Sequence, residues 1–335
     1  MSLAVRLLCG GLITLVVLAS STWADDRVTF APEPGAAHIT VIGDIKDYTG
    51  KVLQIQPRGT SPHSIPIDQI ISIETFYAPP YRQGIALFDQ GDIDAAEPLF
   101  DQALRTEGRP WVQREQYAWM MRCRHRRGDL SGVAEAFQKI LATDAETRHW
   151  GMAPLIWSPT QLSTGQKAMA KTWLAGSFPP MRLIGASWLL DDPTFGEPAR
   201  RGLDELARDT NPMVSQLSRI QLWRTQFATD LNGLTLAGWE RDMEFVPSSL
   251  QAGPRYLIGR GYAQRQEYRQ AAAAFLWLPV LYAEHEPLAA AACLEAGEAL
   301  KRSGLTQEAE NMYRELNIRY GWSPAARELR SRVNP

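Results

Sequence analysis

The chain has 335 residues, of which 45% are hydrophobic and 21% are charged, and its formal net charge at pH 7 is −2. This near-neutral balance gives no support for nonspecific binding to nucleic acid, which requires a basic face. Cys9 lies in an N-terminal apolar run, whereas Cys123 and Cys293 lie far apart in segments with helical periodicity. A disulfide needs Cα atoms within about 7 Å, and stacked helical repeats keep distant segments apart, so we expect two buried thiols.

The first 24 residues have the layout of a secretory signal peptide. Arg6 precedes an apolar stretch from Leu7 to Leu18, and small residues ending at Ala24 follow it. We predict cleavage after Ala24 and export to the periplasm or cell envelope of a bacterium. The apolar stretch is shorter than the roughly 20 residues that span a bilayer, and no later segment reaches that length without charges. If it is retained uncleaved, the same segment would act as a membrane anchor.

Residues 25–37 are rich in proline and glycine and carry little apolar periodicity, which predicts an extended lead-in. Residues 38–77 differ, because apolar and polar side chains alternate there in four or five short runs. Turn sequences at 47–50 and 58–62 separate the runs. The pattern predicts a small barrel-like β-module of the SH3-like or Sm-like kind.

One spacing of small and aromatic residues occurs twice in residues 78–144 and twice in residues 254–335. Small residues are expected where two antiparallel helices cross, because their missing bulk lets the backbones approach. Glycines at the turn within each pair are expected to cap the first helix. The predicted packing and turn residues are Gly84, Gly91, Ala96, Phe100, Gly128, Phe137, Gly259, Ala271, Phe275, Gly297, Gly304, Ala309 and Tyr313.

This fourfold spacing resembles the tetratricopeptide repeat. The resemblance implies a solenoid of helix pairs whose concave surface binds a protein or peptide. Residues 145–253 lose the spacing but keep amphipathic helical runs, and the sequence at 209–212 resembles a junction between HEAT-type repeats. We therefore predict a mainly α fold, an α-solenoid of TPR-like and HEAT-like helix pairs behind the β-module, closed by a C-terminal capping helix. Six tryptophans are expected to pack the middle region: Trp150, Trp157, Trp173, Trp188, Trp223 and Trp239.

A dense cationic stretch, Arg122, Arg124, His125, Arg126 and Arg127, ends the first helix of the second repeat. Cations near a helix C-terminus offset the helix dipole, which is sufficient as a structural role. The functional interpretation is contact with an anion or an acidic peptide. It rests on Arg124, which replaces the apolar or aromatic residue normal at its repeat position, and on Arg127, since arginine offers bidentate donors to carboxylate or phosphate.

A second candidate surface lies at the start of the third repeat. The repeat resemblance implies that Arg255, Tyr256 and Arg260 line the concave face and clamp an extended peptide. The alternative is ordinary solvent-exposed helix polarity.

No metal-ligand spacing, nucleophile motif or phosphate loop is recognisable, so we predict no metal, no cofactor and no catalytic residue. The function we predict is an exported, non-catalytic protein-binding scaffold or assembly factor of the cell envelope. Its protein or peptide partner and its oligomeric state are not defined by the sequence. Two alternatives stay open: the β-module senses a wall component or an anionic ligand, with the helices as an adaptor, or an enzyme site lies in the tryptophan-rich middle.

Overall fold

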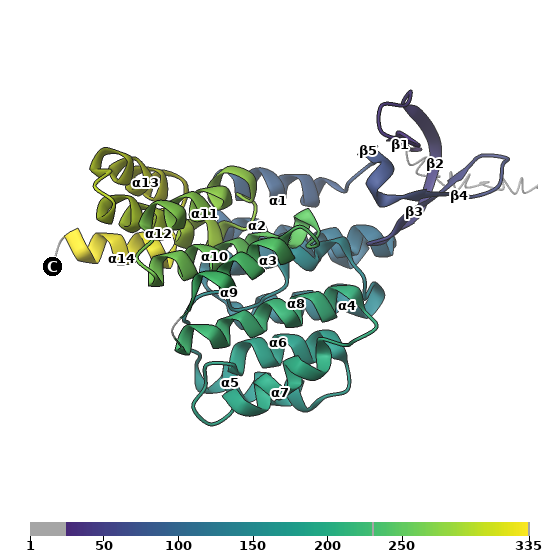
Figure 1. Cartoon of the computed structure of the whole chain (residues 1–335). Coiled ribbons are helices and arrows are strands. Elements are labelled where there is room, and N and C mark those ends of the chain that lie inside the picture. The colour runs from purple at the N-terminus through teal and green to yellow at the C-terminus, as the bar shows by residue number, and fades with distance from the viewer. Residues whose placement is uncertain (1–24, 230, 334–335) are drawn as a thin grey trace, which may run out of the picture.

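The computed structural model describes residues 25–229 and 231–333 and is mainly helical (Figure 1). A five-stranded antiparallel sheet is followed, within these residues, by fourteen α-helices. Figure 1 shows the sheet at one end of the helical array, helices α11 to α14 at the other end, and α5 to α7 as a lobe below them. The predicted fold class, a solenoid of helix pairs behind a small β-module, is confirmed. The signal peptide predicted for residues 1–24 lies outside the described residues.

The strands are β1 (Asp26–Phe30), β2 (Ile39–Tyr48), β3 (Val52–Pro57), β4 (His63–Pro66) and β5 (Ile70–Glu74). The α-helices are α1 (Pro79–Asp89), α2 (Ile93–Thr106), α3 (Pro110–Arg127), α4 (Leu130–Thr143), α5 (Thr164–Ala175), α6 (Pro179–Leu189), α7 (Gly196–Leu206), α8 (Pro212–Leu222), α9 (Gly233–Met243), α10 (Ala252–Gln264), α11 (Tyr268–Leu281), α12 (Glu286–Arg302), α13 (Thr306–Arg319) and α14 (Pro324–Val333). Short 3₁₀ helices are η1 (Ile67–Gln69), η2 (Arg148–Met152), η3 (Trp223–Ala228) and η4 (Ser248–Leu250).

The sheet has the strand order β4-β3-β2-β1-β5, with η1 between β4 and β5. Strand β1 therefore lies inside the sheet, between β2 and β5, where the sequence predicted an extended lead-in. Its alternation is only five residues long, with Asp26 and Val28 buried, and the prolines that follow belong to the β1–β2 turn. The buried Asp26 carboxylate accepts a hydrogen bond from the backbone N–H of Ile45, 2.8 Å away. The β-module thus begins at residue 26.

The repeats pack as antiparallel helix pairs: α1 with α2, α3 with α4, α10 with α11, and α12 with α13. In three pairs a glycine of the first helix faces an aromatic ring of the second. A Cβ placed on Gly297 would lie 2.3 Å from the Tyr313 ring, and one on Gly259 would lie 2.7 Å from the Phe275 ring. Any larger side chain would push the helices apart.

The other predicted packing residues lie within the same pairs. Gly84 meets the ring of Phe100, and a Cβ there would be 2.9 Å from it. Gly128 follows α3 at φ +75°, a left-handed conformation that favours glycine as a C-cap. Ala96, Phe137, Ala271 and Ala309 are buried, and Gly91 and Gly304 also have positive φ in the turns between paired helices.

The middle region is closed by aromatic stacking and burial. Trp223 stacks on Trp239 with 4.9 Å between ring centroids, and Trp173 meets Trp188 edge to face at 5.1 Å. Trp150 and Trp188 are 2% and 3% exposed, and all five of these tryptophans belong to or pack against one continuous core. These tryptophans therefore pack in an apolar core at the centre of the chain.

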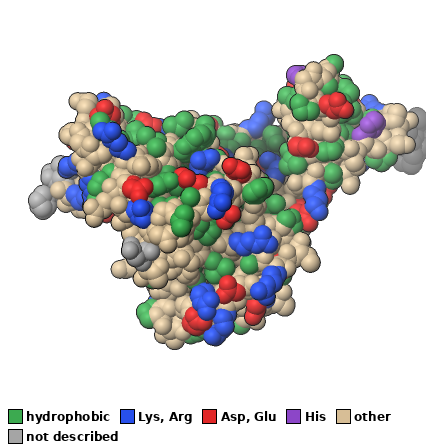
Figure 2. All heavy atoms as spheres, in the orientation of Figure 1, with side chains coloured by type: hydrophobic (Ala, Val, Ile, Leu, Met, Phe, Trp, Pro, Cys, Tyr) green, Lys and Arg blue, Asp and Glu red, His purple; other side chains and the backbone are tan. Residues whose placement is uncertain are grey.

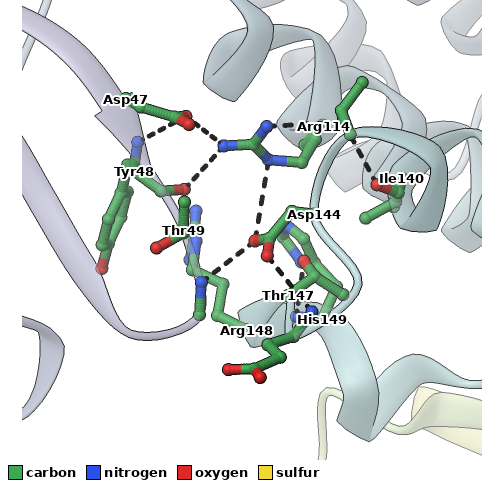
Figure 3. A network of polar contacts seen from close by, with 12 residues as sticks. Asp47, Tyr48, Thr49, Arg114, Ile140, Asp144, Thr147, Arg148 and His149 are labelled. Carbon is green, nitrogen blue, oxygen red and sulfur yellow. Dashed lines mark hydrogen bonds and ion pairs between the residues drawn. The ribbon is translucent and has the colours of Figure 1, made fainter. Parts of the chain in front are cut away.

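The β-module is joined to the helices by a polar network (Figure 3). The Arg114 side chain of α3 is 3% exposed and lies between β2 and the residue that follows α4. Its guanidinium pairs with the Asp47 carboxylate, donates to the Tyr48 carbonyl at 3.0 Å, and lies 4.0 Å from the Asp144 carboxylate. Gly50 approaches the chain so closely that a Cβ there would fall 1.6 Å from the Glu146 carbonyl oxygen. The module is held firmly against α3 and α4.

Candidate functional site

The predicted anion-binding residues Arg124 and Arg127 are used within the protein. Arg124 pairs with Glu97 of α2 at 2.7 Å and donates to the Gly132 carbonyl of α4 at 2.7 Å. Arg127 pairs with the same Glu97 and with Asp94, 3.0 Å away. These pairs tie α3 to the helix before it and the helix after it. Acidic side chains of α2 therefore already pair with both guanidinium groups, and the predicted contact of Arg124 and Arg127 with a partner's anion stays a prediction.

The neighbouring Arg126 connects segments that are distant in sequence. Its guanidinium makes two hydrogen bonds with the Glu286 carboxylate at the start of α12, at 2.7 and 2.5 Å. It also lies 3.7 Å from the ring centroid of Phe88 and 5.9 Å from that of Trp322. The second repeat therefore contacts the fourth, although a simple stack of repeats would keep them apart. Cys123 and Cys293 are nonetheless buried free thiols, as predicted.

Tyr256 and Arg260 bind a peptide segment, but it belongs to the same chain. Residues 153–158, called here the inner segment, follow η2 without helix or strand structure. Arg260 donates to the Trp157 carbonyl at 3.3 Å, and the Tyr256 hydroxyl shares a hydrogen bond with Ser158. Tyr256 is 2% exposed, and burial raises its pKa. In this structure the two residues contact the chain's own inner segment, and the predicted clamp on a partner peptide stays a prediction.

Helix α6 holds the backbone of the inner segment on its other side. The Trp188 indole N–H donates to the Pro154 carbonyl at 2.7 Å, and the Ile156 N–H donates to the Ser187 hydroxyl at 2.9 Å. The Trp157 ring packs on Gly253 of α10 so closely that a Cβ at Gly253 would lie 2.2 Å from the indole. The helices thus recognise a non-helical peptide through its backbone groups and one large side chain.

A groove of about 290 Å³ lies beside the inner segment and is called here the inner groove. Its walls come from α3, α4, η2, the inner segment, α8, η4, α10, α12 and the start of α14, so it includes the place where the second and fourth repeats meet. Most of its lining is apolar. The apolar side chains include Leu130, Trp150, Leu155, Trp157, Leu217, Leu250, Leu288 and Trp322.

Polar side chains gather in the inner groove where α3 faces the start of α12. Arg122 and His125 come from α3, and Glu284 and His285 from the turn before α12. Burial and the neighbouring His285 lower the pKa of His125 to about 4. Burial also lowers the pKa of His285, whose Nε2 lies 3.6 Å from the Glu284 carboxylate. Both imidazoles are therefore neutral near pH 7.

A second groove of about 450 Å³, called here the outer groove, lies between α9 and α11 over α10. Arg255, the remaining predicted binding residue, lines it and lies 4.3 Å from the ring centroid of Trp277. Glu240 faces this groove and accepts a hydrogen bond from the Tyr262 hydroxyl at 2.7 Å. Burial, reinforced by Glu240, raises the pKa of Tyr262 to about 12. Of the five predicted binding residues, Arg255 is therefore the one placed in an open groove.

The sequence does not predict Arg122, His125 and His285 as site residues. Arg122 and His125 nevertheless belong to the cationic stretch that ends α3. The signal that could have found Arg122 is Trp119 three positions earlier on α3, because residues at that spacing share a helix face. His285 carries no such signal, since its neighbours come from distant segments. Among the described residues, no three histidine, cysteine or acidic side chains gather in a geometry that could hold a metal ion.

The fold and the grooves define a helical-repeat protein, TPR-like in its helix pairs and preceded by a five-stranded β-module. The described residues contain no helix with the length and apolar character needed to cross a bilayer. Among solved structures, the chain is similar to one described as PilW, a widely conserved type IV pilus biogenesis factor, with 13% sequence identity and a TM-score of 0.35. The match covers 75% of this chain and 96% of that one. No protein-family model and no curated protein matches the chain.

Proposed function

We propose that this chain is a non-catalytic protein-binding scaffold or assembly factor of the bacterial cell envelope, and that its inner groove holds a non-helical segment of a partner protein. The observation that carries the proposal is the inner segment. Three of its backbone groups, on Pro154, Ile156 and Trp157, are hydrogen-bonded by helix side chains, while its tryptophan packs on a bare glycine. The inner groove beside this segment is likewise lined mostly by apolar side chains, among them tryptophans.

The chemistry of the groove supports binding rather than catalysis. The buried polar groups of the middle region, Ser187, Gln221 and Arg224, hydrogen-bond to one another. Arg224 also pairs with Asp191, and Ser187 holds the inner segment. They therefore act as structural groups. An apolar groove with a few polar groups at one end suits a peptide with large side chains, since burial of each large apolar side chain contributes roughly 1.5–3 kcal/mol.

The test is site-specific photocrosslinking of the mature protein in bacterial envelope extracts. A benzophenone amino acid replaces Trp322 in the groove, and a control replaces Leu234, an 84% exposed residue of α9 outside both grooves. We expect a partner crosslinked from position 322 and none from position 234. Ala291→Trp, which fills the groove, should abolish that crosslink. A crosslink that persists in the filled variant would refute binding in the inner groove.

The alternative of a ligand-sensing β-module needs a different test from removal of the module. Deleting the module would uncover Trp111 and Val112, which belong to its core, and would remove the Asp47 and Tyr48 partners of Arg114. Such a variant would lose stability whatever the module binds. Substitution of exposed side chains on β2 and β5, Ile42 and Ile71, leaves the junction intact and separates the two functions. Partner capture should survive these changes in a scaffold that binds through the inner groove.

A further inference from the structure

Arg122 is an arginine without a carboxylate partner among the described residues. Its guanidinium carbon lies 4.5 Å from the ring centroid of Trp119, and its Nε is buried with no hydrogen-bond acceptor. A buried donor left without an acceptor destabilises the protein. The side chain lines the inner groove. An acceptor that enters the groove would recover this free energy.

The other arginines of the same stretch show how unusual this is. Arg124, Arg126 and Arg127 each pair with one or two carboxylates of neighbouring helices. The other arginines at this end of α3 are therefore paired with carboxylates, whereas Arg122, which faces the groove, is not. In the space-filling view of Figure 2, acidic and basic side chains are interspersed over the face shown, as expected for mutually paired charges.

The groups around Arg122 suit an incoming carboxylate. The neutral imidazoles of His125 and His285 add no positive charge, but each carries one N–H that can donate. Glu286 is neutralised by Arg126, and the Glu284 side chain is 53% exposed to solvent. Among the residues that line the groove, Arg122 is thus the one arginine or lysine, and the Glu284 carboxylate at the same end is exposed to water rather than paired with it.

From this arrangement we propose that the inner groove selects a partner segment in which an acidic side chain lies beside an apolar stretch, and that Arg122 pairs with that carboxylate. The inference rests on the proposed function, because it assumes that the groove holds a peptide. Arginine stacked on an indole is already oriented, so little side-chain freedom is lost when its donors meet a carboxylate. Charge complementarity sets the chemistry of the partner, and the tryptophans of the groove accept its apolar residues.

The experiment uses three fluorescent peptide libraries on the mature protein. Each library has a four-residue core drawn from Leu, Ile, Phe and Trp, and the residue on both sides is fixed as Glu, Gln or Lys. We expect the wild-type protein to retain the Glu library about tenfold more than the Gln library, the ratio for a charge-assisted pair of about 1.4 kcal/mol. In Arg122→Met the ratio should fall to about one. Arg122→Lys, which keeps the charge but not the fork of donors, should fall between them.

Arg302→Met is the matched control, because the guanidinium carbon of Arg302 also lies beside an aromatic ring, 5.5 Å from the ring centroid of Tyr268. Arg302 lines neither the inner nor the outer groove, so the Glu preference should survive its loss. Circular dichroism melts establish that all variants fold. Equal retention of the Glu and Gln libraries by the wild type, or an unchanged preference in Arg122→Met, overturns the proposal. Retention of no library also overturns it, and a persisting crosslink from position 322 would then show that the groove binds by other chemistry.

Discussion

Replacing Arg114 by methionine should separate the β-module from the helices without leaving a cavity. The Asp144 side chain is 7% exposed and would keep its charge in a nearly dry site, and the Tyr48 carbonyl would lose its donor. Removing one partner of a buried ion pair costs about 3–5 kcal/mol. The Asp47 side chain is 33% exposed and can turn to water, and the Gly50 N–H still donates to Asp144 at 3.0 Å. We therefore expect the free energy of unfolding to fall by about 3 kcal/mol, the low end of this range.

The pH dependence of this loss gives a second readout. Desolvation already raises the pKa of Asp144, and Arg114 opposes that effect. Without Arg114 the pKa rises further, so the native state binds a proton more readily than the unfolded state. The free energy of unfolding of the variant should then fall as pH rises through the raised pKa of Asp144. Its loss of stability relative to wild type should therefore be smaller at pH 5 than at pH 8.

The assay is urea unfolding followed by tryptophan fluorescence, because Trp111 packs in the core of the β-module at this junction. Asp144→Asn in the Arg114→Met background removes the stranded charge but can still accept from Gly50, and it should restore at least half of the loss. A loss below about 1 kcal/mol, equal at both pH values, would refute the idea that a buried charge is left behind.

Three further predictions concern the inner groove and its surroundings. Gly253→Ala forces the Trp157 indole out of place, so it should lower the free energy of unfolding by about 1–3 kcal/mol and shift the tryptophan fluorescence to the red. Gly238→Ala, which has open space around it, should cause neither change. Arg126→Met and Glu286→Gln should show a coupling of about 1 kcal/mol or more in a double-mutant cycle, and additive effects would contradict the ion pair. Because the folded-state pKa of His125 is about 4, its contribution is present above its unfolded pKa of about 6.5 and is lost as pH falls from there toward 4. Urea unfolding from pH 7 to pH 4 should show up to about 3 kcal/mol more acid-induced loss in wild type than in His125→Gln, and parallel curves would refute this.

The parts of the fold that depend on local spacing were predictable. Helix pairs repeat a pattern of small and aromatic residues, so the contacts of Gly297 with Tyr313 and of Gly259 with Phe275 follow from positions in one repeat. Strand β1 was missed because five residues of alternation before a proline-rich turn carry too little periodic signal.

The candidate site was harder to predict, because it depends on side chains that meet across the fold. Arg124 was expected to face a ligand, but its partner Glu97 lies 27 residues earlier on another helix, and no local pattern links them. The inner segment has no periodicity at all, and its role follows from Ser187, Trp188 and Arg260, which come from two distant helices. The cationic stretch drew attention to the right helix end, whereas pairing across helices determined which arginine faces the groove.

The ion pair between Arg126 and Glu286 joins residues 160 positions apart. At a synthesis rate of about 5–20 residues per second, α3 is complete roughly ten to thirty seconds before its partner on α12 exists. Throughout that interval the inner face of the second repeat has no fourth repeat beside it. The chain therefore cannot finish folding one repeat at a time, as an open array does. Loss of its last helices would also remove the Glu286 partner of Arg126 and so destabilise the second repeat.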